Sequence, residues 1–264
     1  MQRLCLLAAL LAAMVMPVQA KVVAEVITYQ AGDTELQGYL AYDDAIQGKR
    51  PGVLVVHEWW GHNDYARMRA RLLAEMGYVA LALDMYGEGK QAKHPEDAQK
   101  FSSEIANNID LATRRFTAAM GVLKQQPLTD EQDIAAIGYC FGGAVVLQMA
   151  REGLDLDAVV SFHGSLGTEQ PAQAGDIKAR IMVAHGAEDP FVKQAQLLAF
   201  MEEMNKADAF YRLMVYSGAQ HSFTNPGANE FGKKFDLPLE YNAQADRDSW
   251  EDMRHFLEHA FLAD

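Results

Sequence analysis

The chain has 264 residues, of which 50% are hydrophobic, and this length and composition suit one α/β domain with a large core. Its formal net charge of −13 excludes the basic proteins that bind nucleic acid through the phosphates, so we expect no nucleic-acid partner. The sequence contains no internal repeat and no low-complexity tract, and a single globular domain is therefore expected.

The first 20 residues have the features of a secretory signal peptide. Arg3 gives the segment a positive start, an apolar core covers residues 4–15, and small residues ending at Ala20 are typical of a cleavage site. The apolar core is too short to span a bilayer comfortably, so we expect cleavage after Ala20 and no stable membrane anchor. The mature domain, residues 21–264, is then expected in the periplasm or outside the cell.

The number of cysteines changes when this segment is removed. The full chain contains 2 cysteines, and Cys5 lies within the expected signal peptide, which leaves Cys140 alone. A lone thiol in an exported protein cannot form an internal disulfide and needs another explanation. It is either a buried, inert side chain that packs like a small hydrophobe or a reactive group.

Strand-like and helix-like patterns alternate along the mature chain. The expected strands cover residues 22–29, 35–42, 53–56, 79–83, 134–137, 158–162, 181–184 and 212–216. The expected helices begin near residue 63, span 105–123 as one long helix, follow residue 143, cover 194–205, and close the chain around 250–261. The first two strands are expected to form an antiparallel pair. The repeated strand–helix units predict a mostly parallel sheet with helices on both faces, and functional sites form at the carboxyl ends of such strands.

The most informative segment is Gly138-Tyr139-Cys140-Phe141-Gly142, a G-x-C-x-G sequence between two apolar runs. A strand, a sharp turn and a helix in this order form a nucleophile elbow, in which the turn lifts its central side chain above the edge of the sheet. The glycines allow the strand and the helix to pass closely. We therefore interpret Cys140 as a nucleophile rather than as a packing residue.

Two partners for a nucleophile follow later strands. Asp189 comes after the strand at 181–184, and His221 comes after the strand at 212–216, which is the nucleophile–acid–base order of α/β-hydrolases. Histidine can take a proton from the thiol and return it to a leaving group, and a carboxylate orients the imidazole. The alternatives are a turn role for Asp189, with Glu188 as its competitor, and a solvent-exposed loop role for His221.

The segment His57-Glu58-Trp59-Trp60-Gly61-His62 is similar to the zinc motif H-E-x-x-H but has one residue too many between the histidines. The zinc motif must be helical, whereas this segment leaves a strand, so we expect no metal site. The loop after the third strand commonly supplies one oxyanion-hole N–H. We assign that role to Trp59, with Phe141 as the second donor. Trp60 forms either a wall of the substrate pocket or part of the core.

These elements together resemble the dienelactone hydrolase (carboxymethylenebutenolidase) family, an α/β-hydrolase family, over residues 53–262. The matching segments are Glu58-Trp59-Trp60-Gly61, Asp84-Met85-Tyr86-Gly87, the Cys140 elbow, Gly186-Ala187-Glu188-Asp189 and Gly218-Ala219-Gln220-His221-Ser222-Phe223. The resemblance implies the α/β-hydrolase fold and a triad of Cys140, His221 and Asp189. Tyr86 and Ser222 join Trp60 as expected substrate-binding residues.

The resemblance also implies a role for Glu58. In the family, the matching glutamate lies near the resting thiol and helps to convert it to thiolate when substrate arrives, and a carboxylate beside a thiol would oppose its ionisation until then. One position departs from the family, because Asn225 stands where relatives that cleave dienelactone carry an arginine for its carboxylate. The stretch 224–242 includes Lys233 and Lys234, which could cover the pocket or supply cations.

These observations predict a hydrolase that cleaves a small ester or lactone through Cys140, His221 and Asp189 with an acyl-enzyme intermediate and without a cofactor. Two alternatives have the same residues available. One is a broad carboxylesterase or thioesterase, and the other is a non-enzymatic role of the lone thiol in redox sensing or binding. A redox sensor would not need Asp189 and His221 in triad order.

Overall fold

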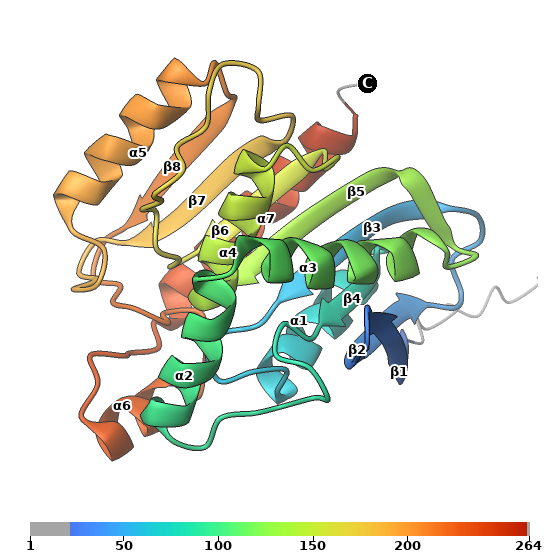
Figure 1. Cartoon of the computed structure of the whole chain (residues 1–264), viewed down its shortest axis with the longest axis horizontal. Helices are drawn as coiled ribbons and strands as arrows, with labels where there is room; N and C mark the ends of the chain where they lie inside the picture. The colour runs from blue at the N-terminus through green and yellow to red at the C-terminus, as the bar shows by residue number, and fades with distance from the viewer. Residues whose placement is uncertain (1–21, 263–264) are drawn as a thin grey trace, which may run out of the picture.

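The computed structural model describes residues 22–262, and the expected signal peptide at residues 1–20 lies outside them. The chain forms one sheet of eight strands in the order β1-β2-β4-β3-β5-β6-β7-β8 (Figure 1). In sheet order the strands are β1 (Val22–Ala31), β2 (Thr34–Asp43), β4 (Val79–Leu83), β3 (Arg50–Val56), β5 (Thr129–Tyr139), β6 (Ala158–Phe162), β7 (Arg180–Gly186) and β8 (Tyr211–Tyr216). The pairs β1–β2 and β2–β4 are antiparallel, and all other neighbours are parallel.

Helices cover both faces of this sheet, as the alternating pattern predicts (Figure 1). One face is packed by α1 (Asp64–Glu75) and α7 (Ala243–Phe261), and the other by α3 (Ile109–Lys124), α4 (Phe141–Arg151) and α5 (Gln194–Lys206). Two further helices, α2 (Pro95–Ala106) and α6 (Ala228–Phe235), share a smaller apolar cluster around Trp60. Among residues 22–262, no helix is long and apolar enough to cross a membrane.

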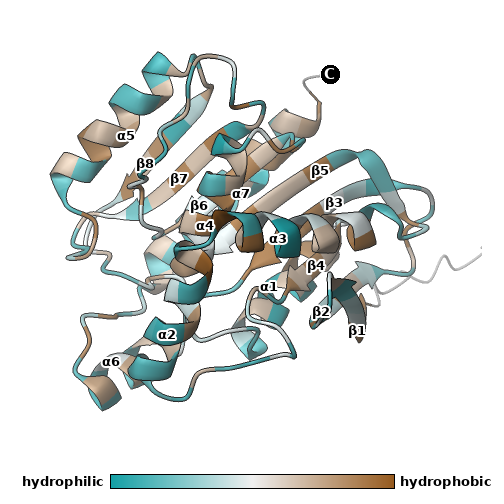
Figure 2. Ribbon diagram, in the orientation of Figure 1, coloured by the Kyte–Doolittle hydropathy of each residue, from teal (hydrophilic) through white to brown (hydrophobic). Residues whose placement is uncertain are grey.

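The central strands are apolar because both of their sides are covered by helices. Val53, Leu54, Val55 and Val56 of β3 are fully buried, and the central strands have hydrophobic colours in Figure 2. Complete burial of an aliphatic side chain stabilises the fold by about 1.5–3 kcal/mol. This double coverage explains why these strands are continuous apolar runs without the alternation of a half-exposed strand.

Two helical segments differ from the prediction. Most of the helix expected over 105–123 is α3, whereas its first residues end a separate helix, α2, that was not expected before residue 105. Asn107 ends α2, and the Asn108 side chain accepts a hydrogen bond from the Leu111 N–H at 3.0 Å to begin α3. Asparagine is a favoured helix cap, and it overrides the apolar periodicity that continues through the break. The second difference is α6, a helix that lies within the stretch 224–242 and was not expected.

The glycines of the elbow are required by close backbone contacts. A Cβ atom on Gly142 would lie 2.3 Å from the carbonyl oxygen of Val56 in β3, and one on Gly138 would lie 2.1 Å from the carbonyl oxygen of Gly142. Any side chain at these positions would push the helix away from the sheet. The two glycines therefore set the depth at which α4 sits and the height of the residue between them.

Candidate active site

Cys140 lies at the tip of the elbow, between β5 and α4. Its backbone has φ 53° and ψ −113°, a conformation that non-glycine residues rarely adopt. The backbone N–H of Cys140 donates to the carbonyl oxygen of Phe162 at 2.9 Å and to Nδ1 of His163 at 3.1 Å. These two contacts hold the strained turn, and the thiol remains partly exposed above the sheet edge.

The structure brings Asp189 and His221 to this thiol from the ends of two other strands. Nε2 of His221, in the loop after β8, lies 3.1 Å from Sγ of Cys140, and Nδ1 lies 2.8 Å from Oδ2 of Asp189. Asp189 follows β7, and its Oδ1 accepts a hydrogen bond from the Phe191 N–H at 2.8 Å, so both carboxylate oxygens have a partner. Both side chains are buried, and the three functional groups form one continuous hydrogen-bonded line.

The charge of the neighbouring groups controls the protonation of His221. Burial alone would lower the pKa of His221, but the charge of Cys140 and the hydrogen bonds to Asp189 and Cys140 raise it to about 10. The imidazole is therefore a strong proton acceptor in this position. That property suits a group that takes the thiol proton and later transfers it to a leaving group.

Glu58 lies in the loop after β3, but its carboxylate does not bond to the thiol. Oε1 accepts a hydrogen bond from the Ser222 hydroxyl at 2.8 Å, and Oε2 accepts one from Nδ2 of Asn225 at 2.6 Å. Burial raises the pKa of Glu58 above its ordinary value, and the hydrogen bonds from Ser222 and Asn225 oppose this rise. The structure thus joins Glu58 to the loop that carries His221.

The two expected oxyanion donors belong to the start of α4 and to the loop after β3. Phe141 is the first residue of α4, so its N–H is one of the helix-terminal groups that have no partner within the helix. Trp59 lies in the loop after β3, and its carbonyl oxygen accepts the Tyr86 hydroxyl at 3.1 Å, which ties this loop to the segment after β4.

The three expected substrate-binding residues have different surroundings. Trp60 is only 2% exposed and stacks on Phe231 of α6 with ring centroids 4.4 Å apart, which favours the core-packing alternative. The Ser222 hydroxyl is occupied by Glu58. Tyr86 packs against Phe141 at 5.5 Å between ring centroids, next to the nucleophile.

A second histidine in contact with Cys140 was missed in the sequence. His163 is buried directly after β6, and burial holds its pKa well below the usual range, so the ring is neutral. Because Nδ1 accepts the Cys140 N–H, the proton is on Nε2, which lies 2.7 Å from Oγ1 of Thr224. Its position at a strand end, in Ser161-Phe162-His163, is the signal that could have identified it.

We expect replacement of His163 by leucine to lower the free energy of unfolding by about 1–3 kcal/mol, because buried hydrogen bonds to Cys140 and Thr224 are lost. His163→Asn should lower the free energy of unfolding by less, since the asparagine side chain keeps a hydrogen-bond acceptor. Asparagine also tolerates the positive φ of 41° at this position. Urea unfolding curves of the two variants and the wild type measure the difference. Equal midpoints for the leucine variant and the wild type would contradict the assignment.

His57 and His62, the two histidines of the segment at 57–62, have structural roles. Nδ1 of His57 contacts the carbonyl oxygen of Glu58 at 2.6 Å, and its Nε2 accepts the Met85 N–H at 3.2 Å. His62 is buried, and burial is the main cause that lowers its pKa to about 3. Within the part of the chain that the structure describes, no three His, Cys, Asp or Glu side chains converge as a metal site.

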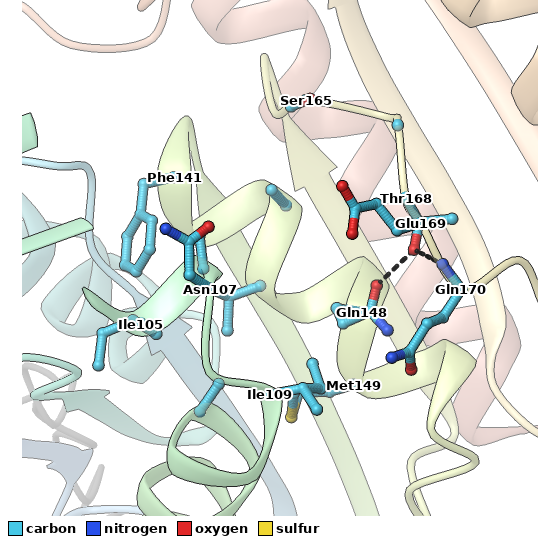
Figure 3. Close-up of a pocket in the computed structure, with 15 residues that line it drawn as sticks. Ile105, Asn107, Ile109, Phe141, Gln148, Met149, Ser165, Thr168, Glu169 and Gln170 are labelled. Carbon is cyan, nitrogen blue, oxygen red and sulfur yellow. Dashed lines mark hydrogen bonds between the residues drawn. The ribbon is translucent and has the colours of Figure 1, made fainter. Parts of the chain in front are cut away.

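A cavity of about 670 Å³ runs along α4 and is lined by Phe141, the residue after Cys140 (Figure 3). Phe141, which follows Cys140, lies at one side of it, and Gln148 and Met149 continue the same face of the helix. The opposite side is polar, where Thr168 donates to the Gln148 side chain at 3.0 Å. Cys140 and His221 are not among the residues that line the cavity.

Comparison with known proteins identifies the family of the chain. A family model described as "Dienelactone hydrolase family" matches residues 36–261. The chain belongs to the dienelactone hydrolase family. Membership makes it an ester or lactone hydrolase, and it confirms the resemblance and the fold class that the sequence indicates.

Individual proteins are similar to this chain over most of its length. Protein usf from Aquifex pyrophilus is 30% identical over 206 residues, which cover 76% of this chain and 87% of that protein. A dienelactone hydrolase-like promiscuous phosphotriesterase from metagenomic libraries is 36% identical with a TM-score of 0.84, over 92% of this chain and 99% of that one. The dienelactone hydrolase from Anabaena variabilis shares the fold, with 21% identity and a TM-score of 0.60 over 81% of this chain and 94% of that one.

Proposed function

We propose that this dienelactone hydrolase family member cleaves small esters or lactones through a Cys140–His221–Asp189 triad. The observation that carries the proposal is the unbroken line of contacts, with 3.1 Å between Cys140 Sγ and His221 Nε2 and 2.8 Å between His221 Nδ1 and Asp189 Oδ2. In that geometry one proton can move from the thiol to the imidazole while the carboxylate stabilises the resulting imidazolium.

In the proposed reaction, Sγ of Cys140 attacks the carbonyl carbon, and the carbonyl π electrons move to the oxygen. The backbone N–H groups of Trp59 and Phe141 stabilise this oxyanion, each by about 3 kcal/mol in the transition state. The tetrahedral intermediate collapses, His221 gives its proton to the departing alkoxide, and a thioester remains on Cys140. Water, deprotonated by His221, then attacks the thioester carbonyl, the C–S bond breaks, and the carboxylic acid is released while Cys140 leaves as the thiolate beside the protonated His221.

The surroundings of the thiol support hydrolysis over a purely redox role. Both partners of Cys140 are buried and hydrogen-bonded to one another, which a redox sensor would not require. The cavity beside Phe141 offers room for part of the substrate. Broad carboxylesterase and thioesterase activity would use the same steps, so the substrate must be determined by comparison of acyl and leaving groups.

A second candidate activity is hydrolysis of phosphotriesters. The observation that favours it is the 36% identity to the dienelactone hydrolase-like promiscuous phosphotriesterase over 92% of this chain. An aryl phosphotriester with a p-nitrophenol leaving group tests this activity beside the corresponding ester, and no release of p-nitrophenol above the uncatalysed rate would exclude it.

The direct test of the mechanism is detection of an acyl-enzyme. We expect a rapidly quenched reaction with a p-nitrophenyl ester to add one acyl group to the peptide that contains Cys140, and mass spectrometry identifies it. A panel of esters and lactones, with and without a free carboxylate, then ranks substrates by kcat/KM. Turnover without any adduct on Cys140, or an adduct on another residue, would overturn the proposed nucleophile.

We also propose that the protein acts in the periplasm or outside the cell, on the basis of the sequence of residues 1–20. N-terminal sequencing of the exported protein should begin at Lys21. A mature protein that retains Met1 would contradict export by this route.

A further inference from the structure

The cavity along α4 follows one face of that helix away from the elbow (Figure 3). Phe141, Ala144, Val145, Gln148 and Met149 all line it, at spacings of three and four residues that place them on the same side of a helix. The strip from Phe141 to Gln148 is about 10 Å long, because a helix rises about 1.5 Å per residue. The cavity is therefore elongated, and it begins at the residue that follows the nucleophile.

The floor of this cavity is apolar. Ile105 of α2 and Ala112 of α3 are buried in the same hydrophobic cluster as Val145 and Met149, and Ile109 packs against that cluster. These side chains offer a ligand no hydrogen-bond donor, so a polar group placed on them would lose its contacts with water without replacement. The floor therefore favours a hydrocarbon chain.

The opposite wall of the cavity belongs to the loop between β6 and β7, and we call residues 165–170 the wall loop. A buried ion pair holds this loop at both ends. Arg151, at the end of α4, donates to both carboxylate oxygens of Glu203 at 2.8 Å and to the Leu166 carbonyl oxygen at 2.8 Å. Glu203 also accepts the Ala172 N–H at 3.0 Å. The wall loop is thus fixed relative to α4, and the cavity is already formed before a ligand binds.

The far end of the cavity is polar, but its groups already have partners. Thr168 Oγ1 donates to Gln148 Oε1 at 3.0 Å and accepts the Gln170 N–H at 3.0 Å, and Gln148 Nε2 donates to Glu152 at 2.9 Å. Glu169 is exposed at the rim, where its carboxylate disfavours a second negative charge. This end therefore limits the length of an uncharged chain and does not favour a carboxylate.

The chemistry of the proposed reaction decides which arm of an ester lies in the cavity. The departing alkoxide must be beside Nε2 of His221, because that atom gives it a proton. The carbonyl oxygen must face the N–H groups of Trp59 and Phe141. His221 does not line the cavity, whereas Phe141 does. The remaining substituent of the carbonyl carbon, which is the acyl chain, is then the arm that extends along α4.

We propose that this cavity is the acyl-chain subsite and that the protein prefers uncharged esters of acyl groups with about six to eight carbons, since an extended chain advances about 1.2 Å per bond along a strip of about 10 Å. The alcohol part of the substrate lies on the His221 side, outside the cavity. This inference rests on the proposed function, and it names the substrate class that the site accepts.

A series of p-nitrophenyl esters tests the preference for the acyl chain. Burial of a methylene group raises kcat/KM by about fourfold when it is complete and by about twofold when it is half complete. Because Ala144 and Gln148 in the lining are only partly buried, we expect about twofold for each methylene, and hence a kcat/KM about 60-fold higher for octanoate than for acetate. An increase of less than about threefold would overturn the proposal.

Alkyl acetates test the direction in which the substrate lies. Their acyl group stays short while the alcohol grows from ethanol to octanol, and titration of the released acid measures the rate. We expect kcat/KM to stay within about threefold along this series, because the alcohol lies outside the cavity. An increase with the alcohol that matches or exceeds the increase with the acyl chain would show that the cavity holds the leaving group, and it would overturn the assignment.

Ala144→Phe fills the cavity one turn from the elbow. We expect the ratio of kcat/KM for octanoate to kcat/KM for acetate to fall at least about tenfold, whereas damage to the nucleophile would lower both rates together. Ala199→Phe, the same change at an exposed position of α5 outside the cavity, is the matched control and should keep the wild-type ratio. Should Ala144→Phe not fold, Ala144→Leu adds less volume and is expected to lower the ratio in the same direction. A folded variant with the wild-type ratio would contradict the subsite.

Binding measurements separate a failure of this inference from a failure of the proposed function. Octanamide carries the acyl chain on an uncharged amide, and isothermal titration calorimetry measures its Kd without turnover. We expect octanamide to bind the wild type about 15-fold more tightly than butanamide, and Ala144→Phe to remove most of this difference. If the wild type hydrolyses no ester but binds the amides in this way, the proposed function is wrong and the chain-binding cavity stands. If it hydrolyses esters but binds both amides equally, the subsite is wrong and the proposed function stands.

Discussion

Replacement of Cys140 by alanine is expected to lower kcat/KM for ester hydrolysis by at least about 10³-fold, because the other groups of a triad leave little catalysis once the nucleophile is removed. Cys140 is at the tip of the elbow, and its Sγ is the atom of the turn that faces His221 at 3.1 Å. In the proposed reaction no other side chain can form the thioester. Initial rates on a p-nitrophenyl ester measure the loss.

The fold should survive this change, because the turn is held by the backbone. The Cys140 N–H bonds to Phe162 and His163 do not involve the thiol, and alanine keeps the Cβ atom. Circular dichroism of Cys140→Ala should therefore match the wild type, and the variant should still unfold cooperatively in urea. Cys140→Ser is the matched variant, since it keeps a weaker nucleophile in place. Wild-type turnover by the alanine variant would exclude Cys140 as the nucleophile.

Replacement of His221 by alanine is expected to cause a comparable loss, since it removes the group that accepts and returns the proton. The charge of Cys140 and the contact with Asp189 outweigh burial and raise the pKa of His221 to about 10. The imidazolium that protonates the leaving group therefore persists through neutral pH. We expect kcat/KM of the wild type, which reports the free enzyme, to decrease as the pH rises through about 10, and the dependence of kcat/KM on pH measures this decrease.

The same raised pKa has a consequence for stability. A histidine whose pKa is higher in the folded protein binds its proton more tightly there, so its contribution to stability is complete below the ordinary value of 6.5 and is lost as the pH rises through about 10. The difference in unfolding free energy between the wild type and His221→Ala should decrease across this range. Urea unfolding at several pH values measures it, and a difference that grows toward high pH would contradict the assignment.

Much of the fold follows from local patterns. The apolar run of β3 predicts a strand that is buried on both faces, and Asn63, which caps α1, coincides with the expected start of that helix. The break between α2 and α3 was missed, because apolar periodicity continues across Asn107 and Asn108. α6 was missed because its apolar residues contact Trp60, a partner that is far away in the sequence.

The sequence by itself determined the elements, their order and the nucleophile elbow, because periodicity, caps and the glycines around Cys140 act over a few residues. Strand ends also placed Asp189 and His221 at the same edge of the sheet. Only the tertiary structure decided which groups bond to the Glu58 carboxylate. One of them is the hydroxyl of Ser222, which lies 164 positions further along the chain. A carboxylate bonds to whichever donors the fold brings within reach, and no local pattern encodes that distance.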